Sequence, residues 1–177
     1  MEVAKCVRVS LMLTLVLLSG AACSSQLKKC VGPSYNGCDL REVDFSNRIL
    51  DDLDFGAADL SRANFAGASL RGSTFSNADL HGANLERADL SGAELSATNL
   101  DYANLRKARL DGAVLRAASL WHADLSSASL VNADIRSTEF HYANLKGADF
   151  TGVEVDEFTN FSSTVLEDTR VDPQRGK

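Results

Sequence analysis

Large apolar residues recur at every fifth position through most of the 177-residue chain. The series begins at Leu40, runs without a slip to Val155 and comprises 24 positions, of which 16 are Leu and 6 are Phe. The residue two positions before them is usually small, and it is Ala in 16 of the 24 cases. The apolar pattern therefore has a period of five residues.

A period of five fits neither a regular helix nor a straight strand. On a helix, steps of five would spread the large side chains around the cylinder, and on a strand they would alternate between the two faces. The large residue and the small residue two before it do share one strand face, so each pentad can form a short extended piece with two inward side chains. A corner after each piece keeps every pentad inward, and four corners close a square coil of 20 residues. Stacked coils pair their backbones, which predicts an all-β solenoid.

Residues that favour tight corners occupy fixed places in the pentads. Asp or Asn stands immediately before the large residue in 14 of the 24 pentads. Gly takes the last place in seven pentads, at Gly67, Gly72, Gly82, Gly92, Gly112, Gly147 and Gly152. Because Asp, Asn and Gly all favour turns, this spacing supports a corner in every pentad.

These A-(D/N)-L-x-x repeats, such as Ala78-Asp79-Leu80, resemble those of the pentapeptide-repeat family. The resemblance covers Cys38 to Glu157, which is 120 residues, 24 pentads and six coils. It implies a right-handed quadrilateral parallel β-helix with four pentads in each coil. The motif builds a scaffold, so it implies a fold and leaves the function open.

The two ends of the repeat region need covers, because an open coil exposes unpaired strand edges. We expect residues 23–37 to form a tether and an N-terminal cap. After Glu157 the period returns shifted by one residue, and we interpret Phe158 as a one-residue bulge before most of a seventh coil. The competing interpretation is an amphipathic helical cap on Phe158, Phe161 and Val165, so residues 158–177 are either a partial coil or a cap and tail. The resemblance also implies a homodimer through the C-terminal end.

Residues 1–22 predict a secretory signal peptide. Lys5 and Arg8 precede an apolar stretch that is too short to span a bilayer, and small residues follow it. Gly20-Ala21-Ala22-Cys23 resembles a bacterial lipobox, in which Cys23 is lipidated and becomes the mature N-terminus. Ordinary cleavage after Ala22 is the alternative. Ser24 then implies sorting to the outer membrane, so we expect an exported bacterial protein, either an outer-membrane lipoprotein held to the membrane by its lipid anchor or a periplasmic protein.

Cysteine parity agrees with export. With Cys6 in the signal peptide and Cys23 lipidated, Cys30 and Cys38 remain as an even pair in an oxidising compartment. Gly, Pro and Asn between them allow the loop to close, which predicts a Cys30–Cys38 disulfide. The sequence has no CxxC pair, which excludes a zinc finger.

Charge and motifs narrow the function further. Residues 38–157 hold 20 Asp and Glu against 11 Lys and Arg, whereas a nucleic-acid binder is usually basic, so we expect no direct nucleic-acid binding. The chain lacks the GxSxG, HExxH and GxxxxGK[ST] motifs, and its inward positions are nearly all apolar. We therefore predict a protein that is not an enzyme and carries no cofactor.

Positions 20 apart share a column, so the pentads form four outer faces. Three of these faces carry Ser, Gly, Asn and scattered charged residues. The fourth is built on Leu40, Leu60, Leu80, Leu100, Leu120 and Phe140 and carries all three His, the only Trp and two of the three Tyr. The candidate binding residues on this face are His81, Asp101, Tyr102, Trp121, His122, His141 and Tyr142. Tyr and Trp combine apolar area with a polar tip, which suits an envelope protein or a glycan as the partner.

Two other interpretations of this face stay open. The rings can form a cross-strand ladder that only stabilises an exposed sheet. A metal site on His122 and His141 with Asp101 or Glu139 is weaker, because no tight ligand spacing anchors it, and we predict no metal.

The sequence therefore predicts a lipid-anchored scaffold outside the cytoplasm that binds a protein partner through this face. One alternative is the DNA mimicry proposed for the gyrase-protecting, quinolone-resistance members of the family, which the acidic charge permits and the signal peptide opposes. A second alternative is a carbohydrate-binding module of the cell envelope that uses Trp121, Tyr102 and Tyr142.

Overall fold

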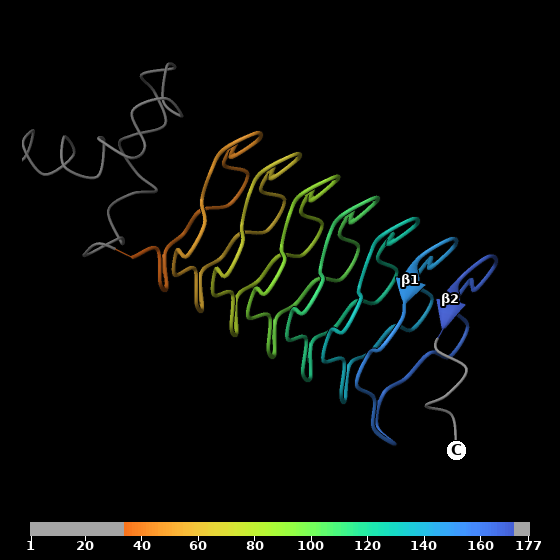
Figure 1. Cartoon of the computed structure of the whole chain (residues 1–177). Coiled ribbons are helices and arrows are strands. Elements are labelled where there is room, and N and C mark those ends of the chain that lie inside the picture. Colours follow the sequence, from red (N-terminus) through yellow and green to blue (C-terminus); the bar gives the residue numbers. More distant parts are fainter. Residues whose placement is uncertain (1–33, 172–177) are drawn as a thin grey trace, which may run out of the picture.

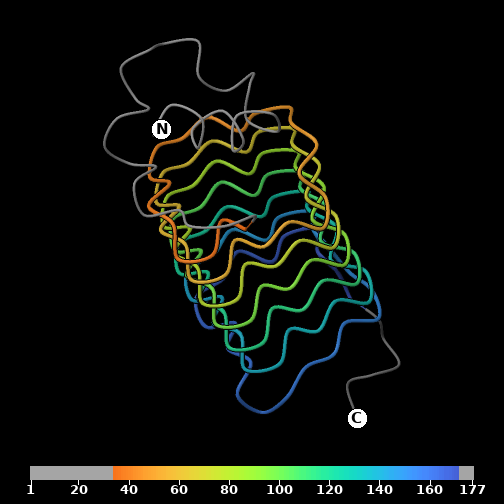
Figure 2. The same ribbon diagram turned by 90° about the vertical axis from the view of Figure 1, so that its left-hand side faces the viewer.

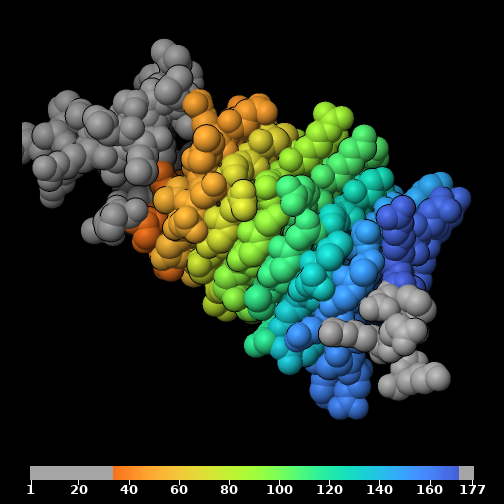
Figure 3. Space-filling view, in the orientation of Figure 1, coloured from red at the N-terminus to blue at the C-terminus, as the bar shows by residue number. Residues whose placement is uncertain are grey.

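Each pentad is a short extended piece followed by a two-residue corner in the computed structural model, which describes residues 34–171. The residue before each large apolar residue forms a parallel bridge with the residue 20 positions later, from Asp39↔Asp59 to Asp134↔Glu154. The coils therefore stack in register along one axis (Figure 1), and the turned view shows them as loops one behind another (Figure 2). In a space-filling view each coil is a separate diagonal band (Figure 3). The predicted all-β solenoid is confirmed.

Regular strands are short in this architecture. Strand β1 (Asp149–Phe150) pairs in parallel with strand β2 (Arg170–Val171), and the other backbone pairs are single bridges. Residues 34–171 contain no helix, and so none that is long and apolar enough to cross a membrane.

Backbone hydrogen bonds run between coils in a fixed direction. The N–H of a large residue and that of the residue two after it donate to the next coil, as from Leu80 to the Asn99 carbonyl at 2.7 Å. The N–H of the preceding residue donates to the coil before, as from Asp79 to the Ala58 carbonyl at 2.9 Å. Each pentad is thereby tied to both of its neighbours in the stack.

The corners have a left-handed backbone. The residue two after the large one has a positive φ in pentad after pentad, at the seven predicted glycines and at 18 residues that are not Gly. The next N–H returns to the carbonyl of the large residue, as from Ala83 to Leu80 at 2.9 Å, which is the arrangement of a type II turn. The Asp or Asn before the large residue accepts the N–H two residues on, as Asp44 does from Ser46 at 2.9 Å. Asp and Asn are therefore frequent at this position because their side chains cap the corner.

The core is a column of Leu and Phe side chains with Ala beside them. All the large residues from Leu40 to Phe150 are buried, and Phe45 and Phe65 stack one coil apart at 4.9 Å. Tyr35 stacks on Phe55 at 4.9 Å and so covers the start of this column. Where a hydroxyl replaces Ala, it donates to a carbonyl of the preceding coil at 2.7 Å, from Ser73, Thr98 and Thr138.

The final coil differs from the expectation in the place of its extra residue. Bridges span 21 residues here, as in Glu139↔Asn160, but Phe158 lies in a corner and is not the bulge. The extra residue is Asp156, whose Oδ1 accepts the Ser137 N–H at 2.7 Å, where other coils supply a backbone carbonyl. The same oxygen accepts the Phe158 N–H at 3.1 Å and so closes the corner. The helical alternative is wrong for residues 158–171.

Three predictions concern residues outside the described range: the signal peptide at 1–22, lipidation of Cys23, and Cys30. Cys38 is buried and disulfide-bonded. Its partner also lies outside residues 34–171, so the Cys30–Cys38 pairing stays a prediction.

Candidate binding surface

The structure brings all seven candidate binding residues onto one side of the solenoid. We call them the aromatic face: His81, Asp101, Tyr102, Trp121, His122, His141 and Tyr142. They occupy the corners that follow Leu80, Leu100, Leu120 and Phe140, and consecutive corners are joined by backbone hydrogen bonds. Tyr102 N–H donates to the Trp121 carbonyl at 2.8 Å, and His122 N–H donates to that of His141 at 3.0 Å. The backbone register therefore sets the spacing of the face.

The rings form one continuous stack. Tyr102 and His122 lie parallel with their centroids 5.1 Å apart, and His122 and Tyr142 follow at 5.0 Å. Trp121 meets His122 edge-on at 4.8 Å, while His141 meets Tyr142 edge-on at 4.9 Å. Each such ring pair contributes about 0.2–1 kcal/mol to the stability of a sheet.

The stack remains open to solvent. Tyr102 is 51% exposed, Trp121 41% and Tyr142 48%. A stack that served only the solenoid would bury these rings more completely, since their apolar area is the main gain from packing them. The exposed rings are therefore available to a partner.

Two carboxylates lie beside the rings without an ion pair among the described residues. Asp101 Oδ1 accepts the Trp121 N–H at 2.9 Å and the Ser119 hydroxyl at 2.5 Å. Glu139 is exposed, and within residues 34–171 its carboxylate contacts the Asn160 amide, with Nδ2 at 3.5 Å. Both carboxylates are available to a cation.

The alternative metal site does not form. Within residues 34–171 no group of three His, Cys, Asp or Glu side chains is placed to hold a metal ion. The His122 ring lies between two tyrosines, and His141 Nδ1 lies 3.2 Å from Asn160 Nδ2.

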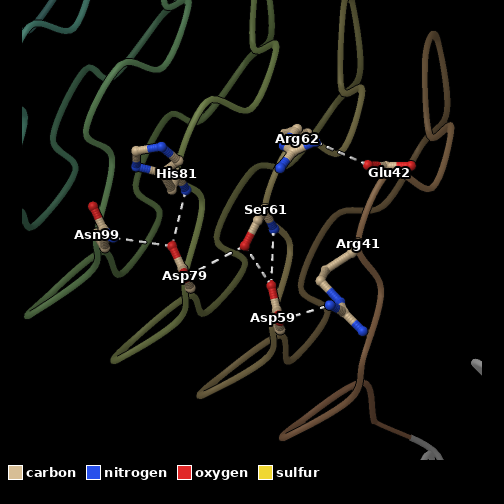
Figure 4. Close-up of a pocket in the computed structure, with 8 residues that line it drawn as sticks. All are labelled: Arg41, Glu42, Asp59, Ser61, Arg62, Asp79, His81 and Asn99. Atoms are coloured by element: carbon tan, nitrogen blue, oxygen red, sulfur yellow. Dashed lines mark hydrogen bonds and ion pairs between the residues drawn. The ribbon is translucent and has the colours of Figure 1, made fainter.

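A shallow charged groove continues this side of the rod toward the N-terminus (Figure 4). It has a volume of about 600 Å³ and is lined by Arg41, Glu42, Asp59, Ser61, Arg62, Asp79, His81 and Asn99. The groove and the aromatic face share His81, so they form one surface along six coils, from Arg41 to Tyr142.

The cations of this groove are already paired. Arg41 bonds to Asp39 at 2.8 Å, which raises the pKa of its guanidinium, and Arg62 meets Glu42 at 3.2 Å. Asp79 forms no ion pair within residues 34–171 and accepts hydrogen bonds from the His81 N–H and the Asn99 amide, each at 3.0 Å. The 20-residue spacing in the sequence places the groove residues on one face. The groove itself depends on the conformations of the long side chains, which the spacing does not predict.

This side of the rod carries an excess of negative charge. Six carboxylates lie along it, against the two guanidinium groups of Arg41 and Arg62. The carboxylates are Asp39, Glu42, Asp59, Asp79, Asp101 and Glu139. The uncompensated charge lies at the C-terminal part of the groove and beside the rings.

The stacked 20-residue coils and the corner-capping Asp and Asn define the class of protein, which is a four-sided β-solenoid. A family model described as pentapeptide repeats matches residues 38–77, 78–116 and 113–152, in eight copies. The chain therefore belongs to the pentapeptide-repeat family, and the expected right-handed quadrilateral β-helix is confirmed.

Solved structures of the family are similar to the chain. A pentapeptide repeat protein from the thylakoid lumen of Arabidopsis thaliana is 36% identical, with 71% of this chain and 77% of that one covered and a TM-score of 0.48. One from Nostoc PCC 7120 is 36% identical, with 56% and 84% covered and a TM-score of 0.51. QnrB1, a plasmid-mediated fluoroquinolone resistance protein, is 18% identical, with 73% and 88% covered and a TM-score of 0.56, which shows the shared fold alone. No curated protein matches the chain.

Proposed function

We propose that this protein is a non-enzymatic scaffold that binds a protein partner through the aromatic face. One observation carries the proposal: Tyr102, Trp121 and Tyr142 are exposed yet packed into one cluster. Among residues 34–171 the other exposed large aromatic side chain is Phe158, in the final coil. Rigid rings with polar tips give much contact area for little loss of side-chain entropy, which suits a protein interface.

The geometry favours a protein over a glycan or a DNA mimic. Both faces of the His122 ring are covered by tyrosines, so this central ring offers a sugar no face to stack on. Many rod carboxylates cap corners or bond to arginine, as Asp134 does with Arg116 and Arg136, instead of projecting as a phosphate-like column. The likeness to QnrB1 adds only the fold.

The interior supports a role without catalysis. The buried polar residues among 34–171 are Ser73, Thr98, Thr138 and Asp134. The three hydroxyls donate to backbone carbonyls, and the carboxylate is held by two guanidinium groups. None of them forms a free acid–base pair that a reaction could use.

We place the scaffold outside the cytoplasm, anchored by a lipid on Cys23. The signal-like segment Leu11–Leu18 and the lipobox-like residues before Cys23 support this location. The disulfide at Cys38 agrees with it, because structural disulfides persist in oxidising compartments.

Partner capture tests the function. The triple variant Trp121→Ser, His122→Ser, Tyr142→Ser should keep the far-ultraviolet circular dichroism spectrum and lose the envelope protein that the wild type captures. A matched triple, Arg87→Ser, Arg106→Ser, Lys107→Ser, changes corner residues on the neighbouring face and should retain it. Retention by the aromatic variant would show that the rings only stabilise the sheet.

Fatty-acid labelling tests the location. The wild type should take up the label and fractionate with the envelope, and Cys23→Ala should lose the label. Unprocessed, soluble wild-type protein in the cytoplasm would contradict the anchor.

A further inference from the structure

The charge of the aromatic face indicates the chemistry of its partner. Asp79, Asp101 and Glu139 have no ion pair with a Lys or Arg side chain in the described structure, whereas several carboxylates elsewhere on the rod do. Arg fits such a place, because its planar guanidinium binds a carboxylate and also stacks on an aromatic ring. The exposed Trp121 and Tyr142 rings lie between and beside these carboxylates.

The spacing of the face indicates the shape of the partner. The backbones of Asp101 and Glu139 lie two coils apart along the axis, with Trp121 on the coil between them, and the Asp101 carboxylate leans toward that coil, where it accepts the Trp121 N–H. Two coils span about 9.6 Å, since stacked backbones lie ~4.8 Å apart. The ring stack agrees, with successive steps of 5.1 and 5.0 Å from Tyr102 to Tyr142. A polyproline II helix advances ~9.3 Å in three residues, so it presents the same side at every second coil.

The backbone of the face excludes binding by β-strand addition. Added β-strands need free N–H and C=O groups, and the Tyr102 and His122 N–H groups already donate to the next coil. A polyproline II segment needs no backbone partner, and proline rings dock on exposed Tyr and Trp.

We infer that the aromatic face binds an extended, proline-rich segment of a partner protein that carries Arg at every third residue and lies along the solenoid axis. Two successive Arg side chains pair with Asp101 and Glu139, and the prolines between them pack on Trp121. The inference rests on the proposed function and adds the chemical class of the partner.

Fluorescence anisotropy with a labelled dodecapeptide of Arg-Pro-Pro repeats tests the inference on the purified protein. The peptide should bind saturably, and binding should weaken as salt is raised. Matched peptides of Glu-Pro-Pro and Arg-Gly-Gly repeats remove the charge and the polyproline conformation in turn, and both should bind at least about tenfold more weakly. Equal binding of the Arg-Gly-Gly peptide would overturn the extended proline-rich shape.

Paired variants locate the contact. Asp101→Asn with Glu139→Gln keeps the hydrogen bonds to Trp121 and Ser119 and should weaken the Arg-Pro-Pro peptide about tenfold. Glu86→Gln with Asp168→Asn removes the same charge from the neighbouring face and should change affinity by less than about twofold. Equal losses in the two variants would mean that the peptide responds only to the overall charge of the rod, which overturns the inference.

Failure of this inference is separable from failure of the scaffold. If the peptide does not bind and the aromatic triple variant still loses its captured partner, the scaffold stands and the partner chemistry is wrong. If that triple variant keeps its partner, the proposed function fails whatever the peptide does.

Discussion

The corner residues combine backbone strain with exposure. Eighteen residues other than Gly hold a positive φ, including Tyr102, His122 and Tyr142 at +58°, +56° and +58°. A left-handed conformation costs roughly 1–2 kcal/mol for residues with a Cβ, whereas Gly adopts it freely. One other face places Gly72, Gly92 and Gly112 at this position, so the aromatic stack occupies corners where a simpler solenoid would use glycine.

Relief of this strain gives the first prediction. Ala97 is an exposed corner residue at φ +55°, and Ala97→Gly should raise the free energy of unfolding by about 0.5–1 kcal/mol. Urea unfolding followed by circular dichroism measures the change. Ser96→Gly, one residue earlier and without a positive φ, should instead lower stability, and a loss of stability in Ala97→Gly would contradict the interpretation.

Acid sensitivity gives the second prediction. The hydrogen bond from Arg136, together with that from Arg116, lowers the pKa of Asp134 from 3.8 to about 2. The ionised form is thus favoured in the folded state, and its contribution is complete above about pH 4 and lost as the pH falls toward 2. Wild type should therefore lose about 1–2 kcal/mol more than Asp134→Asn between pH 5 and pH 2. Parallel loss in both proteins, from denaturant midpoints at each pH, would contradict this role.

At the scale of elements, the final coil depends on one inserted residue. Asp156 binds the Ser137 N–H, the Phe158 N–H and the Thr159 hydroxyl. The coil after it still pairs in order, with Asn160 donating to the Thr138 carbonyl at 2.9 Å. The shift in period is therefore accommodated by a side chain that takes the place of a backbone acceptor.

Loss of this carboxylate gives the third prediction. Asp156→Ala should destabilise the final coil, because four donors, including the Ser137 hydroxyl, lose their acceptor. Amide hydrogen exchange at Asn160, Val165 and Arg170 should accelerate, while exchange at Leu100 should not change. Asp168→Ala serves as the control, because it changes a carboxylate of the same coil that makes no hydrogen bond within residues 34–171. Equal acceleration in this variant would contradict the role of Asp156.

Comparison of the regular coils with the final coil shows what could be predicted from the sequence. The apolar period predicted the coil, and columns 20 apart placed the seven aromatic-face residues together, because backbone pairing alone sets that register. The apolar pattern marks only a shift between Val155 and Phe161, and side-chain hydrogen bonds decide that Asp156 is the extra residue. The ring angles of the stack and the ion pairs of the groove depend on rotamers, which no periodicity encodes.

At the scale of the whole molecule, each coil contacts only its neighbours, so stability should be nearly additive along the rod. Deletion of residues 43–62 removes one coil and joins Glu42 to Ala63 in the same register. This variant should fold, with an unchanged circular dichroism spectrum per residue. Deletion of residues 43–60 brings Ser61 into the wrong place of the pentad, so this variant should not fold. In limited proteolysis it should be digested rapidly, whereas the variant that lacks residues 43–62 should resist. Equal folding of both variants would contradict a strict five-residue register.

The fixed direction of the inter-coil hydrogen bonds makes the two ends of the rod chemically different. The N–H groups of Phe161, Leu166 and Val171 point along the axis and meet no acceptor in residues 34–171, and Leu166 and Val171 are exposed. The same edge also presents carbonyl groups, because each inner coil accepts there from the next coil, as Ala78 does from the Asn99 N–H. A second copy added head to tail would continue the ladder and produce fibres, whereas a copy that meets the same end across a two-fold axis would pair antiparallel and close a dimer. The orientation of the second copy thus decides whether the protein forms a discrete particle or polymerises.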